Sequence, residues 1–215
     1  DLDFVAVVER PIDEAAFASL QRLHDELHHL PVRFAMDLEG TYADREVVRR
    51  FRPTSARVPN LERGRGERLK WSPVWASWIV HLSILREQGI ALYGPPPAEL
   101  VDPISADELR QTVAPILLEW GGAFLAKPDL AAQPGYQPYA VLSICRMLYT
   151  LHHGAVTSKR KAAHWASAAL GVTWRSLIEA AWAERRRDPL PVAPERVEPT
   201  IEFVRMAMAR ATLTP

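Results

Sequence analysis

The sequence has little of what would mark a secreted protein, a membrane protein or a nucleic-acid binder. It contains one cysteine, Cys145, so no disulfide can form within the chain, and this fits a reducing compartment. Its longest apolar stretch, residues 74–85, is interrupted by polar side chains and is too short to cross a bilayer. Lysine plus arginine and aspartate plus glutamate number 26 each, so the basic excess of a nucleic-acid binder is absent. We therefore predict a cytoplasmic protein that binds neither membrane nor nucleic acid.

The chain also lacks an initiating methionine and a secretory signal peptide. It begins at Asp1, so we expect further residues upstream of the first element. What is present suffices for a core, because 215 residues, 48% of them hydrophobic, are enough for one large domain or two small ones. Cys145 lies in the apolar run Val141–Cys145, which favours a buried hydrophobic side chain over a nucleophile.

Proline marks the joints between the longer elements. The 18 prolines cluster around residues 53–59, 95–103, 128–138 and 189–199. Apolar periodicity predicts strands at 2–8, 31–42 and 90–93, with an exposed loop at 49–70. It predicts helices at 12–28, 73–87, 105–125, 138–153, 158–170, 173–186 and 195–212. The pattern Ser105–Glu108 predicts a capping box at the start of one helix.

Strands and helices therefore mix in the first part of the chain, and helices alone make up the rest. We predict an α+β fold with two domains. The first, residues 1–129, combines a mixed sheet with helices, and the second, residues 130–215, is an all-α helical bundle.

Two pairs of carboxylates stand on predicted strands, each pair two residues apart. Asp1 and Asp3 open the first strand, and Asp37 and Glu39 lie on the second. Residues i and i+2 of a strand face the same side, so each pair projects from one face. If the strands are neighbours, one sheet edge carries up to four like charges, which costs free energy unless a cation lies among them. The pattern fits either a divalent-cation site or a solvated strand end.

The chemistry open to such a cluster is nucleotidyl transfer. Two carboxylates can hold Mg²⁺ against a nucleoside triphosphate, and the metal stabilises the attacking and leaving oxygens. A third carboxylate within hydrogen-bond reach can take the proton from an acceptor hydroxyl. An acidic rim also attracts a cationic acceptor. Spacing alone leaves the choice between this chemistry and solvated carboxylates open.

Five stretches, in the same order and at similar spacing, resemble the aminoglycoside adenylyltransferases of the 3''/9 type, a family of polymerase-β-like nucleotidyltransferases. Asp1–Val8 resembles the Asp-x-Asp strand of that superfamily, and Leu38–Tyr42 resembles the catalytic-base strand. Arg86–Pro95 resembles the stretch between the family's two domains. Cys145–Tyr149 and Ser158–Ala166 resemble signatures of its helical C-terminal domain. The resemblance extends over nearly the whole chain.

The resemblance implies roles for the acidic residues. Asp1 and Asp3 are implied to be the Mg²⁺ ligands, and Glu39 the general base that activates the acceptor hydroxyl. Asp37 competes with Glu39 for this role, because a shift of the strand by two residues keeps the same face. Glu39 is preferred because Thr41–Tyr42 then also match the family. Either carboxylate would also contact the acceptor substrate.

In the helical domain, the resemblance implies that Lys159 contacts the phosphates of ATP, for which its point charge is suited. Arg146 and Tyr149, on the preceding predicted helix, are further candidates for ATP binding in the same interdomain cleft. The implied reaction is the Mg²⁺-dependent transfer of AMP from ATP to a hydroxyl of a small cationic acceptor, an aminoglycoside antibiotic like spectinomycin or streptomycin. The implied protein is a monomeric antibiotic-resistance enzyme.

Two departures from the family's pattern bear on this expectation. The Gly-Ser motif that binds the triphosphate lies upstream of Asp-x-Asp in the family, so the sheet is expected without its first strand here. Leu148 stands where streptomycin-modifying relatives carry tryptophan, which leaves spectinomycin, another aminoglycoside or an unrelated hydroxyl compound open. Two further hypotheses remain: a non-catalytic binding or regulatory relative, and a nucleotidyltransferase that modifies a different small molecule, a protein or tRNA.

Other conspicuous residues have ordinary explanations. Most of the tryptophans fall on apolar faces of predicted helices, which favours core packing. His24, His28 and His29 lie near a predicted helix end without the carboxylates of a metal site. The arginines of residues 49–70 are expected on a solvated loop.

Overall fold

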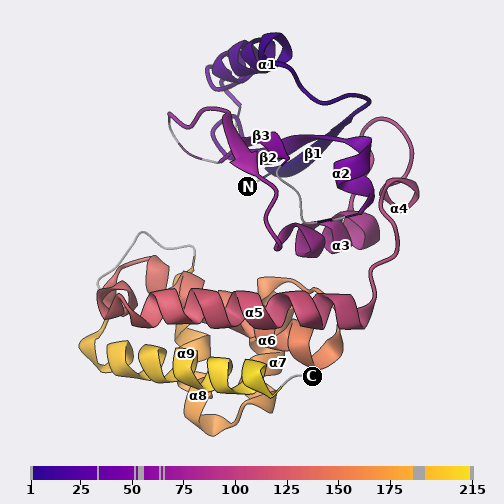
Figure 1. Cartoon of the computed structure of the whole chain (residues 1–215). Helices are drawn as coiled ribbons and strands as arrows, with labels where there is room; N and C mark the ends of the chain where they lie inside the picture. Colours follow the sequence, from indigo (N-terminus) through magenta and orange to yellow (C-terminus); the bar gives the residue numbers. More distant parts are fainter. Residues whose placement is uncertain are drawn as a thin grey trace. The chain divides into compact units, whose positions relative to one another are not determined.

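The computed structural model describes residues 2–32, 34–50, 52, 56–62, 64, 66–185 and 192–213. The chain forms two compact units, Asp1–Pro103 and Ile104–Pro215. Among the described residues, the first unit contains a sheet and helices and the second contains helices without strands (Figure 1). The predicted α+β fold class is therefore confirmed.

The first unit is built on a four-stranded sheet in the order β1 (Leu2–Val8), β2 (Leu38–Asp44), β3 (Arg57–Leu61) and β4 (Lys70–Pro73). β1 and β2 run parallel, whereas β3 is antiparallel to both of its neighbours. The sheet is thus mixed, as predicted, and its first strand has the predicted bounds. Its two parallel strands carry the candidate acidic residues Asp3 and Glu39.

The second strand is shorter at its start than predicted. The alternation in residues 31–42 suggested a strand throughout, but the backbone turns before Leu38. The amide of Ala35 donates to the carbonyl of Val32 (3.1 Å), and the amide of Asp37 donates to the carbonyl of Phe34 (3.0 Å). These local hydrogen bonds form a turn in place of strand pairing. The alternation of apolar and polar residues in this segment therefore does not mark a strand, and Ala35, on the face predicted to be polar, is buried.

Two further predictions are wrong. Residues 49–70 are not a loop throughout, because they contain β3 and the first residue of β4, with Val58 and Leu61 buried. Their arginine and proline content hid these strands. Conversely, residues 90–93 form no strand: Ile90, Leu92 and Tyr93 are 86%, 94% and 99% exposed. Apolar side chains alone do not make a strand where no neighbour supplies ladder hydrogen bonds.

Helix α1 (Glu14–Leu27) covers one face of the sheet (Figure 1). Asp13 caps it by accepting a hydrogen bond from the amide of Ala16 (2.8 Å). The ring of Phe17 stacks on Trp71 of β4, with centroids 5.0 Å apart. The remaining helices of this unit are α2 (Arg45–Arg49), α3 (Trp78–Gln88) and α4 (Pro97–Leu100). The sheet therefore has a covered face, against α1, and an opposite face that carries the odd-numbered side chains of β1 and β2.

The second unit is a bundle around α6. Its helices are α5 (Ala106–Leu125), α6 (Tyr136–His153), α7 (Lys159–Ala169), α8 (Val172–Glu184) and α9 (Val197–Thr212), with 3₁₀ turns at Pro128–Ala132 and Pro194–Arg196. The capping box at Ser105 and Glu108 is present, as predicted. Cys145 of α6 is buried, which raises the pKa of its thiol to about 12 and confirms the predicted hydrophobic role. Within the described ranges, no helix has the length and apolar character needed to traverse a bilayer.

The boundary between the units lies before α5, whereas the sequence placed it after this helix, at residue 129. Helix α5 packs against α6 and α9. At Gly121 the approach to α9 is so close that a Cβ atom would lie 2.7 Å from the side chain of Met208. The amphipathic pattern of α5 marked it as a helix but could not show which core its apolar face joins.

Candidate functional site

The parallel pairing of β1 with β2 brings the two acidic strands together. Asp3 lies directly opposite Glu39 in the register of the two strands. Neighbouring strands are about 5 Å apart, and paired residues of parallel strands project from the same face. Both residues are exposed. The structure thus places one candidate metal ligand beside the preferred candidate base, on the face of the sheet opposite α1.

The other two acidic candidates have different positions. Asp37 precedes β2 and is half-buried, and its carbonyl accepts a hydrogen bond from the amide of Leu2 (2.9 Å). It therefore helps to fix the start of β1 through its main chain. Asp1 lies outside the described residues. The predicted group of four carboxylates is thus represented in the structure by a strand pair, Asp3 and Glu39, and by the adjacent Asp37.

The donor atoms of the pair fit Mg²⁺ in kind, since it prefers carboxylate oxygens and retains several waters. Their number is small. In the part of the chain that the structure describes, no group of three or more His, Cys, Asp and Glu side chains could hold a metal ion. Because Asp1 is not among those residues, a shared site of Asp1 and Asp3 stays a prediction.

Behind the acidic pair, on the face covered by α1, lies an aromatic cluster that the sequence did not predict. It consists of Phe4 on β1, Tyr42 on β2 and His24 on α1. His24, which the sequence placed near a helix end and outside any metal site, is only 2% exposed. Helical spacing could have found it, because His24 follows Phe17 by two turns and shares its buried face.

The candidate ATP-binding residues lie on two packed helices of the second unit. Lys159 is the exposed first residue of α7, and its Nζ lies 5.4 Å from the ring centre of Tyr139. Arg146 is half-buried on α6. Tyr149 is 8% exposed, with Lys161 Nζ 5.8 Å from its ring centre. Tyr149 therefore offers little surface to a ligand in this structure, whereas Lys159 is accessible.

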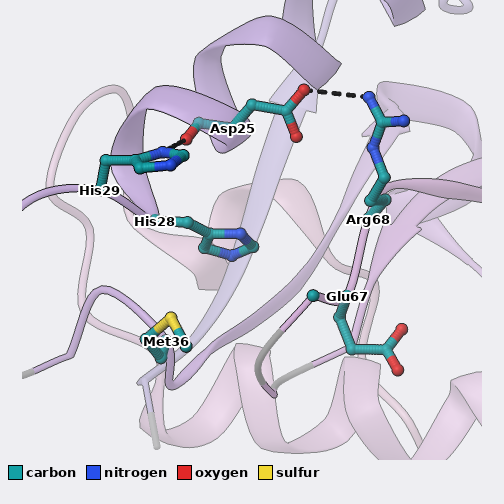
Figure 2. Close-up of a pocket in the computed structure, with 7 residues that line it drawn as sticks. Asp25, His28, His29, Met36, Glu67 and Arg68 are labelled. Carbon is teal, nitrogen blue, oxygen red and sulfur yellow. Dashed lines mark hydrogen bonds and ion pairs between the residues drawn. The ribbon is translucent and has the colours of Figure 1, made fainter.

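Two cavities lie away from the predicted residues. One, of about 460 Å³, lies in the first unit between the end of α1 and the segment that leads into β4 (Figure 2). Arg68 donates to Asp25 across it (2.9 Å), and His29 Nδ1 lies 2.6 Å from the carbonyl oxygen of Asp25. Another, of about 520 Å³, lies between α7 and α8 beside Arg160 and Trp182. Neither is lined by a candidate metal ligand, base or ATP-binding residue.

Comparison with solved structures defines the class of fold. The chain is similar to the spectinomycin adenyltransferase AAD(9) from Enterococcus faecialis, which was crystallised with ATP and spectinomycin. The TM-score is 0.69, the sequence identity is 16%, and the match covers 97% of this chain and 85% of that one. At this identity the likeness establishes a shared fold.

The family follows from the sequence. Residues 99–210 match the family described as aminoglycoside adenylyltransferase, C-terminal domain, so the chain belongs to the aminoglycoside adenylyltransferase family. It is 30% identical over 127 residues to an aminoglycoside (3'') (9) adenylyltransferase from Rhizobium radiobacter, covering 58% of this chain and 45% of that protein. An enzyme of the same name from Escherichia coli is 28% identical over 127 residues, covering 58% and 46%. The matches thus span less than half the length of these relatives.

Proposed function

We propose that the protein is a nucleotidyltransferase that transfers AMP from ATP to a hydroxyl of an aminoglycoside-type antibiotic. The observation that carries this proposal is the register of Asp3 with Glu39 on neighbouring parallel strands. It sets a metal-ligand candidate beside a base candidate, both of them exposed, in a chain of the aminoglycoside adenylyltransferase family.

In this proposal each residue has a stated task. Mg²⁺ would be held by Asp3 together with Asp1, and when bound it neutralises charge on the triphosphate. Glu39 takes the proton from the acceptor hydroxyl, which then attacks the α-phosphorus of ATP as pyrophosphate leaves. Lys159 contributes a point charge to the phosphates. Because these residues belong to both units, the proposal requires an interdomain site in which both units act on one ATP molecule.

The acceptor class is supported by charge and by the relatives. A face that exposes Asp3 and Glu39 attracts a polycation more than an anion. The fold relative was crystallised with spectinomycin. The resemblance described above adds that Leu148 stands where streptomycin-modifying relatives carry tryptophan. We therefore propose spectinomycin ahead of streptomycin. A monomer in the cytoplasm, with no nucleic-acid partner, completes the proposal.

The test of the reaction is direct. The full-length protein is incubated with Mg-ATP and a panel of aminoglycosides, and the mass of each drug is then measured by mass spectrometry. We expect an added AMP on spectinomycin that disappears when the metal is chelated. The absence of an adduct on every member of the panel would contradict the proposed function.

The assignment of the base has its own test. Glu39→Gln should lower the rate by about 10²- to 10⁴-fold, the usual contribution of a general base, while binding of ATP persists in calorimetry. Asp37→Asn is the competing variant, and Glu119→Gln, at an exposed position of α5, is the control. A large loss in Asp37→Asn with none in Glu39→Gln would transfer the role to Asp37.

The role of Lys159 is separable from that of its basic neighbour. Lys159→Ala should raise the KM for ATP about 10- to 150-fold, because a charge-assisted contact to a phosphate is worth roughly 1.5–3 kcal/mol. Arg160→Ala is the matched control, since Arg160 lies next in the same helical turn and lines the cavity between α7 and α8. Equal effects of both variants would indicate a general electrostatic contribution instead of a specific contact.

A further inference from the structure

The aromatic cluster of Phe4, His24 and Tyr42 lies directly behind the acidic pair. Phe4 follows Asp3 on β1, and Tyr42 is three residues beyond Glu39 on β2. Neighbouring strand residues face opposite sides, so Asp3 and Glu39 project from one face and Phe4 and Tyr42 from the other. Contacts that fix β1 and β2 on the face of Phe4 and Tyr42 therefore also fix the distance between Asp3 and Glu39 on the other face.

The first contact is between Phe4 and Gly40, which are paired in the register of β1 and β2. A Cβ atom on Gly40 would lie 2.4 Å from the carbonyl oxygen of Phe4 and 2.5 Å from its Cδ1. The ring of Phe4 therefore lies over the Cα of Gly40, in space that any other residue would fill. Gly40 directly follows Glu39, so this contact is made by the backbone that carries the candidate base.

The second contact ties α1 to the same strand. His24 Nε2 lies 2.9 Å from the hydroxyl of Tyr42, within a hydrogen bond. The imidazole also stacks on Phe4, with centroids 5.9 Å apart and planes inclined by 19°, and Tyr42 meets Phe4 edge-on at 5.5 Å. One buried side chain on α1 thus contacts both acidic strands, one by stacking and the other by a hydrogen bond.

The buried environment of His24 also favours one protonation state, the neutral imidazole. Its Nδ1 is buried, with no hydrogen-bond partner among the described residues. Burial, and secondarily the neighbouring His28, lower the pKa of His24, while Asp25 acts in the opposite direction. Burial raises the pKa of Tyr42. At neutral pH a neutral imidazole and a protonated phenol therefore share one hydrogen bond, and a protonated His24 would place an unpaired charge in the cluster.

We propose that His24 and Tyr42 are positioning residues for nucleotidyl transfer: their hydrogen bond, with Phe4 seated over Gly40, holds β1 and β2 in the register that sets Asp3 beside Glu39. This inference rests on the proposed function for its catalytic consequence, but its structural part stands independently. Both residues lie behind the sheet, on the face opposite Asp3 and Glu39, so both act through the strands. A misplacement of about 1 Å in a catalytic group can cost up to about 10²-fold in rate, so a device of this kind has a measurable effect.

A second contact between α1 and the sheet supplies the control. Phe17 stacks on Trp71 of β4, which is separated from the acidic strands by β3. Phe17→Leu weakens the docking of α1 without removing any contact of His24 or Tyr42. It distinguishes a specific positioning role from a general loss of helix packing.

The experiment compares Tyr42→Phe, His24→Leu, His24→Gln and Phe17→Leu in the full-length protein. We expect Tyr42→Phe and His24→Leu to lower kcat about tenfold with the KM for ATP unchanged, because alignment affects the transition state more than ground-state binding. His24→Gln should restore most of kcat, since its amide can bond to the hydroxyl of Tyr42. Phe17→Leu should leave kcat within about twofold of the unmodified protein, as expected for a contact that does not align the reacting groups.

Amide hydrogen exchange gives a readout that needs no activity. In Tyr42→Phe, the amides of β1 and β2 should exchange faster than in Phe17→Leu at matched global stability, because the strand pair opens locally. Equal exchange and equal kcat in the two variants would overturn the positioning role. If the unmodified protein adenylylates no acceptor, the proposed function fails, while the exchange comparison still decides whether His24 and Tyr42 hold the strands.

Discussion

At the scale of single residues, the burial of His24 makes the stability of the first unit depend on pH. Its pKa is lowered chiefly by burial, so the folded first unit binds a proton less readily than the unfolded chain. Stability therefore rises with pH wherever the unfolded chain is the more protonated. The contribution of neutral His24 to the free energy of unfolding is fully present above about pH 6.5, the ordinary pKa of histidine. It is lost as the pH falls from there through the lowered pKa of the folded state.

We accordingly predict that the first unit becomes easier to unfold below about pH 6.5, the ordinary histidine value, and that His24→Gln removes most of this dependence. Urea denaturation followed by hydrogen exchange of the β1 and β2 amides would measure it at a series of pH values. His29→Gln is the control, since His29 is exposed and lies two residues beyond the end of α1. An unchanged pH dependence in His24→Gln would assign the effect to other groups.

Gly40 is a second residue at which the backbone itself is constrained by a neighbour. Its place opposite Phe4 leaves no room for a side chain, because the nearest atom is main-chain oxygen, which cannot rotate away. Gly40→Ala should therefore destabilise the first unit by about 1–3 kcal/mol, the usual range for overpacking. Chemical denaturation of the variant tests this, with Gly122→Ala on α5 as the control, where a Cβ meets nothing within 4 Å. Equal stability of the Gly40 variant and the unmodified protein would contradict it.

At the scale of elements, the packing of α6 against α9 contains an incompletely paired polar group. Gln137 is fully buried, and its Nε2 donates to the hydroxyl of Thr200 (3.0 Å) while its Oε1 has no partner among the described residues. A buried acceptor without a partner costs about 1–3 kcal/mol, whereas replacing both partners by apolar groups of similar shape can be neutral or stabilising. We therefore expect that the packing of α6 against α9 does not need the hydrogen bond between Gln137 and Thr200 for its stability.

We predict that Gln137→Leu combined with Thr200→Val keeps or raises the thermal stability of the second unit. Thr200→Val alone should lower it by about 1–3 kcal/mol, because both polar ends of Gln137 are then left buried and unpaired. Calorimetry of the two variants measures the difference. A double variant less stable than Thr200→Val alone would show that the amide fits its cavity better than leucine does.

At the scale of the whole molecule, the chain consists of two units with separate cores. The second unit has its own buried helix, α6, and its one thiol, Cys145, is inaccessible and has a raised pKa. We predict that residues 104–215 fold when expressed alone, as expected for a domain with its own core. Cys145 in this fragment should react with a thiol reagent only on unfolding. Rapid labelling under native conditions would show that the fragment lacks a stable core.

The sequence by itself determined the elements whose cause is local. The capping box at Ser105, the apolar periodicity of the long helices and the buried run around Cys145 are properties of short segments, and each is found in the structure. The family could also be recognised from the sequence, because Cys145–Tyr149 and Ser158–Ala166 are short local patterns and lie within the matched residues 99–210. The roles of Asp3, Glu39 and Lys159 stay predictions.

The tertiary structure alone decided how distant segments meet. The register that sets Asp3 opposite Glu39, and the contact of His24 with Tyr42, depend on which strands pair and which helix covers them. The strand β3 was hidden for the same reason, because ladder bonds from β2 and β4, and not its own composition, make it a strand. Long-range pairing is determined by the sum of many weak contacts, which no short pattern of residues records.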